Sequence, residues 1–235
     1  MLICHKQAVL WRCMMWFWVY ATLGWGNPVI QPWALPNEEK RQELTRLYLK
    51  KHCGEACVRE GQIIVEMEPK VVVVHWTAGG TAKSAWNTFA SATLRGRKSI
   101  AGGGALNVSS QYLIDRDGTI YELLPPIRVA RHCIGLNHLS IGIENVGDGK
   151  KYPITDEQIA SNIALIRYLK EKYPITHLIG HHEHNKMRGH EYFIEQDPKY
   201  KSYKPDPGEA VMKRIRRGLT DLALEGVPLN SSPKK

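Results

Sequence analysis

The chain has 235 residues, of which 43% are hydrophobic and 23% are charged, and its formal net charge is +9. This length and balance suit one sizeable α/β domain with appendages, and the positive charge indicates an anionic partner, either nucleic acid, a membrane surface or an acidic polymer. No RNP-like, zinc-finger or helix-turn-helix signature accompanies the basic residues, which argues against a nucleic-acid-binding module.

The first 26 residues have the pattern of a secretion signal. Lys6 and Arg12 precede an apolar run from Cys13 to Gly24. This run is shorter than the roughly 20 residues that span a bilayer. We therefore expect residues 1–26 to be a signal peptide of an exported, periplasmic or secreted protein with no stable membrane insertion after cleavage.

Residues 27–61 are predicted to form a proline-rich linker followed by a helix. Asn37 has the position of an N-cap, and the helical pattern ends before Gly54. Cys53 and Cys57 can close a small disulfide loop in an oxidising compartment, and the sequence leaves open whether they do. Two cysteines alone do not make a structural zinc site.

A run of four valines, residues 71–74, predicts a central strand that is buried on both faces. His75 and Trp76 follow it, and the next residues are a threonine, an alanine and two glycines. Such a strand end delivers a side chain to the rim of a sheet. The alternative is a histidine that is satisfied by a backbone carbonyl.

Further strands are predicted downstream. An Asp-Gly turn at residues 117–118 indicates a β-hairpin over residues 111–124. In the predicted strand 140–144, pleating places Gly142 and Glu144 on one face, so the carboxylate has room in front of it. Thr155 and Gln158 form a capping box that opens a helix.

The last segments carry more ligand-type side chains. A short strand over residues 177–180 leads to His181 and His182, of which only one can face a metal if both lie on a strand. Lys204 and Asp206 each precede a proline, so both are biased to extended backbone and point the same way. Asp206 is equally suited to cap the following helix. That helix is expected to end near residue 219, and residues 221–235 are expected to be a disordered tail.

Alternating strands and helices predict a single mixed β-sheet with helices on both faces, built by residues 62–220. Three segment ends present His75, His181 and Asp206, and Glu144 and Lys204 are further ionisable groups. A catalytic zinc site uses three nitrogen or oxygen ligands and one open position. The spacings match no short zinc motif, because only the fold brings such distant segments together.

Six ordered segments carry a family resemblance. They are residues 74–78 (VHWTA), 107–121 (NVSSQYLIDRDGTIY), 130–132 (ARH), 137–144 (NHLSIGIE), 179–181 (IGH) and 204–208 (KPDPG). In this order they resemble the zinc-dependent N-acetylmuramoyl-L-alanine amidase type 2 family, whose fold is shared with peptidoglycan recognition proteins.

The resemblance implies that His75, His181 and Asp206 bind one zinc ion, that Glu144 is the general base, and that Lys204 stabilises an oxyanion. The substrate would be peptidoglycan or a muropeptide, cut between N-acetylmuramic acid and L-alanine by a monomeric protein. A non-catalytic peptidoglycan-binding module is the alternative.

Other positions depend on the same resemblance. Trp76, Asn107 and His132 are expected to contact substrate or to support the ligands. Gln111 stands where many relatives have a histidine, which puts the usual role of that position in doubt. His182 is the competing candidate for the metal ligand at His181.

Overall fold

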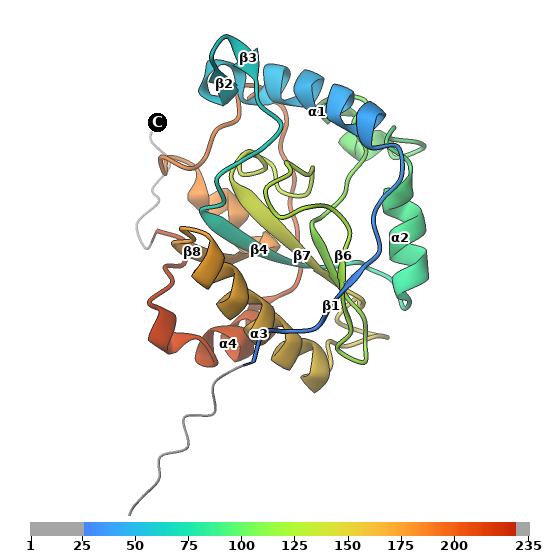
Figure 1. The fold of residues 1–235 in the computed structure, drawn as a ribbon, viewed down its shortest axis with the longest axis vertical. Helices are drawn as coiled ribbons and strands as arrows, with labels where there is room; N and C mark the ends of the chain where they lie inside the picture. Colours follow the sequence, from blue (N-terminus) through green and yellow to red (C-terminus); the bar gives the residue numbers. More distant parts are fainter. Residues whose placement is uncertain (1–25, 229–235) are drawn as a thin grey trace, which may run out of the picture.

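The computed structural model describes residues 26–228, which form one mixed six-stranded sheet with helices on both faces (Figure 1). The strand order is β1-β6-β5-β7-β4-β8, and all neighbours are parallel except β5 and β6. The strands are β1 (Ile30–Pro32), β4 (Val71–Trp76), β5 (Tyr112–Ile114), β6 (Ile120–Glu122), β7 (Ser140–Asn145) and β8 (His177–Gly180). This arrangement confirms the predicted fold class.

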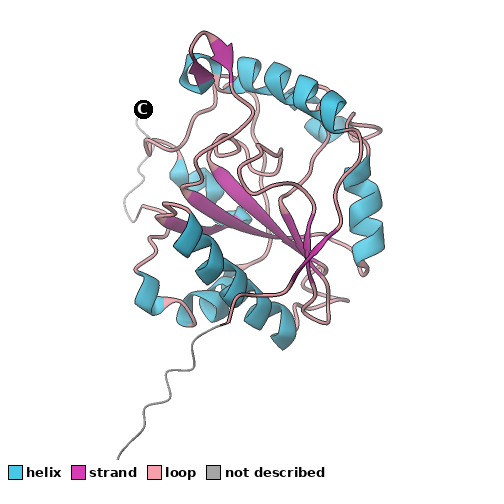
Figure 2. Cartoon of the chain, in the orientation of Figure 1, coloured by secondary structure: helices cyan, strands magenta, loops and turns pink. Residues whose placement is uncertain are grey.

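Helices lie on either side of this sheet (Figure 2). The α-helices are α1 (Glu38–His52), α2 (Ala82–Ala90), α3 (Asp156–Lys172) and α4 (Glu209–Arg217). Short 3-10 helices are η1 (Gly54–Cys57), η2 (Lys98–Gly103), η3 (His181–Met187) and η4 (Thr220–Leu222), and a small hairpin joins β2 (Val58–Arg59) to β3 (Gln62–Ile63). The helices α3 and α4 run together below the sheet in Figure 1, whereas α1 and α2 lie on its other side.

The valine run explains why β4 is central. All four valines have no exposed surface. Val72 and Val74 belong to the cluster that contains the buried residues of α3 and α4, whereas Val71 and Val73 pack with Cys133 on the opposite side. His75 continues the second set, so its side chain faces away from α3 and α4.

The segment before α1 is more ordered than a linker. Ile30–Pro32 pairs in parallel with β6 as an edge strand, where the missing N–H of Pro32 is tolerated. Asn37 occupies the N-cap position of α1 as predicted, but its backbone is left-handed and its side chain makes no capping hydrogen bond. The helix ends at His52 as expected, and Cys53 and Cys57 form a disulfide.

The predictions for the two ends of the chain compare differently with the structure. The predicted signal peptide lies outside the described residues, apart from Gly26. The expected tail is ordered between residues 221 and 228, because η4 includes Leu222 and Glu225 forms a parallel bridge with His177 at the edge of β8. Within residues 26–228, no helix is both long and apolar enough to cross a membrane.

Candidate metal centre

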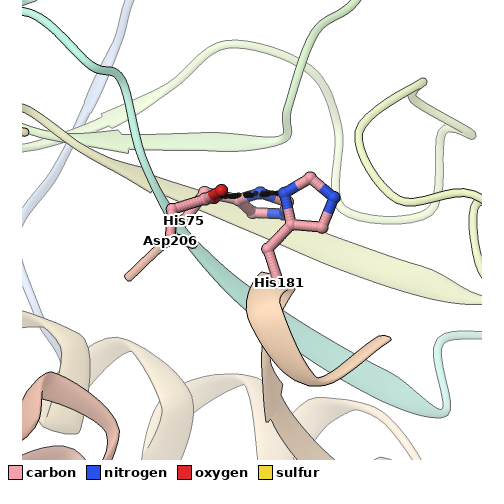
Figure 3. Close-up of side chains that lie close together, drawn as sticks. All are labelled: His75, His181 and Asp206. Atoms are coloured by element: carbon pink, nitrogen blue, oxygen red, sulfur yellow. Dashed lines mark hydrogen bonds and ion pairs between the residues drawn. The ribbon is translucent and has the colours of Figure 1, made fainter. Parts of the chain in front are cut away.

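Three predicted ligands converge on one point (Figure 3). Nδ1 of His75 lies 2.9 Å from Nδ1 of His181, and both nitrogens approach Oδ2 of Asp206, at 3.3 and 3.1 Å. All three residues are buried. The structure therefore brings His75 to two side chains that lie more than 100 residues further along the sequence.

The parallel strands explain this convergence. β4 pairs with β7 on one side and β8 on the other, so the carboxyl ends of all three meet at one edge of the sheet. His75 is directly opposite Glu144 in the register, and His181 follows the last residue of β8. Asp206 comes from the extended segment before α4, whose N-cap is Gly208. The alternative role of Asp206 as the helix cap is therefore wrong.

The donor set fits one zinc ion. Zinc bonds of about 2.0–2.2 Å in a tetrahedron separate neighbouring ligand atoms by roughly 3.3–3.6 Å, close to the distances found between these three atoms. Two imidazoles and one carboxylate are also the ligand types that zinc prefers. His75, His181 and Asp206 would hold the ion, and a catalytic zinc with three protein ligands would take water or substrate as its fourth ligand.

His132 fixes which nitrogen of His75 faces this point. Nε2 of His132 lies 3.1 Å from the carbonyl oxygen of Ser140, which can only accept a hydrogen bond, so Nε2 carries the proton. Burial, with the neighbouring His75, lowers the pKa of His132 well below its ordinary value, so the ring is neutral and its Nδ1 is an acceptor. Nε2 of His75, 3.1 Å away, then donates to it and leaves Nδ1 with a free lone pair.

The protonation states of the other two ligands also suit a metal. Burial lowers the pKa of His181 to about 3, so its imidazole is neutral near pH 7. Burial alone would raise the pKa of Asp206, but hydrogen bonds from His181 and His75 outweigh it and hold that pKa well below its usual range. A neutral imidazole and an ionised carboxylate are the forms that bind zinc.

Glu144 has the properties of a proton acceptor. Its Oε2 is buried and has no hydrogen-bond partner among the described residues. Burial raises the pKa of this carboxyl well above its ordinary value, and the charge of Asp206 adds to the effect, whereas Lys204 and Arg97 oppose it. A carboxyl whose pKa is raised toward the working pH can take up and release a proton.

These groups line one cleft with a volume of about 380 Å³. Trp76, His132 and Lys204 also lie on its walls. A larger cavity of about 860 Å³ lies between β8, α4 and the chain after η4, and it contains none of the three ligands. The cleft at His75 is therefore the candidate site, because it combines the ligand cluster with a free carboxylate and a cation.

Asn107 and Gln111 lie away from the cleft. The amide nitrogen of Asn107 donates to the carbonyl oxygens of Thr88 and Ser91, which fixes the chain after α2. Gln111 donates to the carbonyl oxygen of Arg128 and accepts from the backbone N–H of Gly142. Both side chains are buried, and their amide groups are engaged with backbone.

His181 and His182 lie in the 3-10 helix η3, so the expectation that both lie on a strand is wrong. The side chains still diverge. Nδ1 of His182 contacts the backbone oxygen of Asp206 at 3.3 Å, and its Nε2 lies 3.7 Å from Glu209, outside the ligand cluster. Of the two histidines, only His181 reaches the cluster.

Two features of the site were not drawn from the sequence. A Cβ at Gly142 would lie 2.9 Å from the ring of His132, so this glycine is needed for His132 to lie against the strand. The side chain of Arg131 is buried beside the cleft, and its place in the segment 130–132 did not indicate a role for it. Both depend on approaches between distant segments.

The fold and the ligand cluster together define an α/β protein with a candidate metal centre at the carboxyl edge of its sheet. Residues 65–209 match the family model described as N-acetylmuramoyl-L-alanine amidase. The match covers more than half of the chain, and the protein belongs to this family.

Solved structures give weaker similarities. The N-acetylmuramoyl-L-alanine amidase LysC from Clostridium intestinale URNW is 21% identical, with a TM-score of 0.48, and the alignment covers 84% of this chain and 99% of LysC. Bumblebee PGRP-SA is 19% identical, with a TM-score of 0.49, and the alignment covers 86% of this chain and 99% of that protein. No curated protein sequence matches the chain.

Proposed function

We propose that this protein is a zinc-dependent amidase that hydrolyses the bond between N-acetylmuramic acid and L-alanine in peptidoglycan or muropeptides. The observation that carries the proposal is the geometry of the site. Three ligand atoms lie within 3.3 Å of one another. Glu144, whose Oε2 has no hydrogen-bond partner among the described residues, is directly opposite His75 on the neighbouring strand. His75, His181 and Asp206 would hold the ion.

A zinc ion bound there supplies Lewis-acid chemistry, by polarising a carbonyl and acidifying water. Glu144 takes a proton from the attacking water as its oxygen adds to the amide carbon. It then delivers that proton to the leaving nitrogen as the carbon–nitrogen bond breaks. Lys204 lies on the wall of the same cleft, where its ammonium meets the negative charge that develops on the carbonyl oxygen.

The proposed location is outside the cytoplasm. The Cys53–Cys57 disulfide supports it, because such bonds form and persist in oxidising compartments. The basic N-terminal segment with its apolar run supports export as well.

The deciding experiment measures zinc content and release of free stem peptide from purified peptidoglycan. Wild type should bind about one zinc and release peptide. Glu144→Ala should keep the metal and lose at least about 100-fold in kcat, because the proton acceptor is absent. Asp206→Ala should lose both metal and activity.

His190→Ala is the matched control, because this histidine packs against His177 and Tyr192, away from the ligand cluster. It should retain both zinc and activity. If wild type binds muropeptide but releases no peptide, the protein is a recognition module and the amidase proposal fails.

A further inference from the structure

Arg131 is a buried cation. Its exposed fraction is 2%, and no carboxylate within residues 26–228 forms an ion pair with it. The guanidinium lies over the rings of Tyr48 and Tyr200, and its carbon is 5.6 Å from each ring centroid. Burying a charge is costly unless its donors are hydrogen-bonded. The hydrogen-bond partners of this guanidinium therefore show which segments it holds in place.

The guanidinium joins two segments next to the cleft, namely residues 100–106 and the segment that begins at Tyr200 and lines the cleft from Tyr203 onward. Nε and Nη2 donate to the hydroxyl of Tyr200, at 3.1 and 2.8 Å. Nη1 donates to the carbonyl oxygens of Gly104 and Leu106, at 3.2 and 2.5 Å, and Nη2 also donates to the carbonyl oxygen of Ile100. Residues 100–106 are thereby tied to the segment that begins at Tyr200.

The second of these segments delivers Lys204 to the site. Residues 200–206 contain no helix or strand. Past Tyr200, this segment is held by a hydrogen bond from Asn185 to the carbonyl oxygen of Ser202 and by one from His182 N–H to the carbonyl oxygen of Asp206. Within the described chain, the ammonium of Lys204 has no hydrogen bond or ion pair of its own, so its position depends on the backbone that carries it.

We propose that Arg131 and Tyr200 are positioning residues that hold Lys204 where the oxyanion forms. This inference rests on the proposed amidase function. A displacement of about 1 Å at a catalytic group can cost about 100-fold in rate. The fork geometry of arginine suits this task, because one planar guanidinium binds the carbonyl oxygens of residues 100–106 and the hydroxyl of Tyr200 at once.

Tyr200→Phe is the sharpest variant, because it retains the buried ring and removes only the hydroxyl that accepts from Arg131. We expect kcat to fall about 10- to 100-fold, while KM and zinc content stay near wild type. Tyr112→Phe is the matched control. Tyr112 is also buried, and its hydroxyl bonds to Glu122 on the hairpin rather than to a wall of the cleft. It should leave kcat unchanged.

A double-mutant cycle tests whether Tyr200 acts through Lys204. In a Lys204→Ala background, Tyr200→Phe should have no further effect on kcat, because the group that it positions is absent. Independent, multiplying losses would overturn the inference, and so would a Tyr200→Phe variant with wild-type kcat.

Hydrogen exchange separates this inference from the proposed function. In the metal-free protein without substrate, the amides of residues 199–204 and 206 should exchange faster in Tyr200→Phe than in wild type or Tyr112→Phe. If wild type proves to have no amidase activity but this difference is found, the amidase proposal fails and the anchoring of the segment stands. Equal exchange in all three proteins would overturn the anchoring.

Discussion

His132 orients His75, a candidate metal ligand, through a chain of hydrogen bonds that ends at the backbone carbonyl of Ser140. Replacing it with phenylalanine keeps a ring of similar size against Gly142 but removes the acceptor for Nε2 of His75. We expect His132→Phe to weaken zinc affinity by about 10- to 100-fold, measured by competition with a chelator.

His190→Phe is the control for this prediction, because His190 packs against His177 and Tyr192, away from the ligand cluster. Its zinc affinity should equal that of wild type. Unchanged affinity in His132→Phe would mean that His75 keeps its tautomer without this contact.

At the residue scale, the sequence predicted the identity of the converging ligands better than the role of their neighbours. Asp206 suited a helix cap and a metal ligand equally, because both need a carboxylate after an extended residue. The structure places Gly208 at the cap and brings the carboxylate of Asp206 to His75 and His181. Asn107 illustrates the opposite case, since its membership of a motif did not reveal that its amide is engaged with backbone.

At the scale of elements, the end of α1 contacts residues 195–196, which precede the segment that leads to the site. Nδ1 of His52 lies 2.7 Å from Oε1 of Glu195, and the backbone N–H of Gln196 donates to the carbonyl oxygen of His52. The side chain of Gln196 also donates to the carbonyl oxygen of Cys53. The disulfide to Cys57 therefore stabilises the turn on which this segment lies.

We expect removal of the disulfide by the paired change Cys53→Ser and Cys57→Ser to lower the free energy of unfolding by about 2 kcal/mol. The estimate follows from the short loop that the bond closes. Urea denaturation of the oxidised protein measures it.

Reductant provides the internal control for this prediction. Adding it should lower the stability of wild type toward that of the double variant and leave the double variant unchanged. A wild type that is equally stable with and without reductant would contradict the prediction.

Elements with strong local signals were predictable. The capping box at Thr155 forms as expected and opens α3, and the Asp-Gly turn joins β5 to β6. By contrast, β1 has only three residues and two of them are exposed, so it lacks the apolar alternation that marks a strand. Its pairing with β6 is a long-range contact, which local propensity does not encode.

At the scale of the whole molecule, the positive charge extends into the cleft. Its walls carry Arg97, Arg131 and Lys204 against the carboxylates of Glu144 and Asp206. The net charge of the protein is +9. A stem peptide carries free carboxylates, so the field of the protein favours its approach.

This field predicts a moderate salt dependence on the proposed substrate. The distance over which charges act, the Debye length, falls from about 10 Å at 0.1 M salt to about 3 Å at 1 M. We therefore expect KM for a soluble muropeptide to rise several-fold over that range, with kcat nearly constant. Arg97→Ala should make KM depend less on the salt concentration, because this exposed side chain lies at the cleft. Arg214→Ala is the control, since Arg214 pairs with Asp156 at the helices on the opposite face of the sheet.

A nucleic-acid partner would behave differently. The logarithm of its affinity would fall steeply with the logarithm of the salt concentration, with a slope proportional to the number of phosphate contacts. A KM that does not depend on salt, or an equal slope in both variants, would show that the charge of the cleft does not guide the substrate.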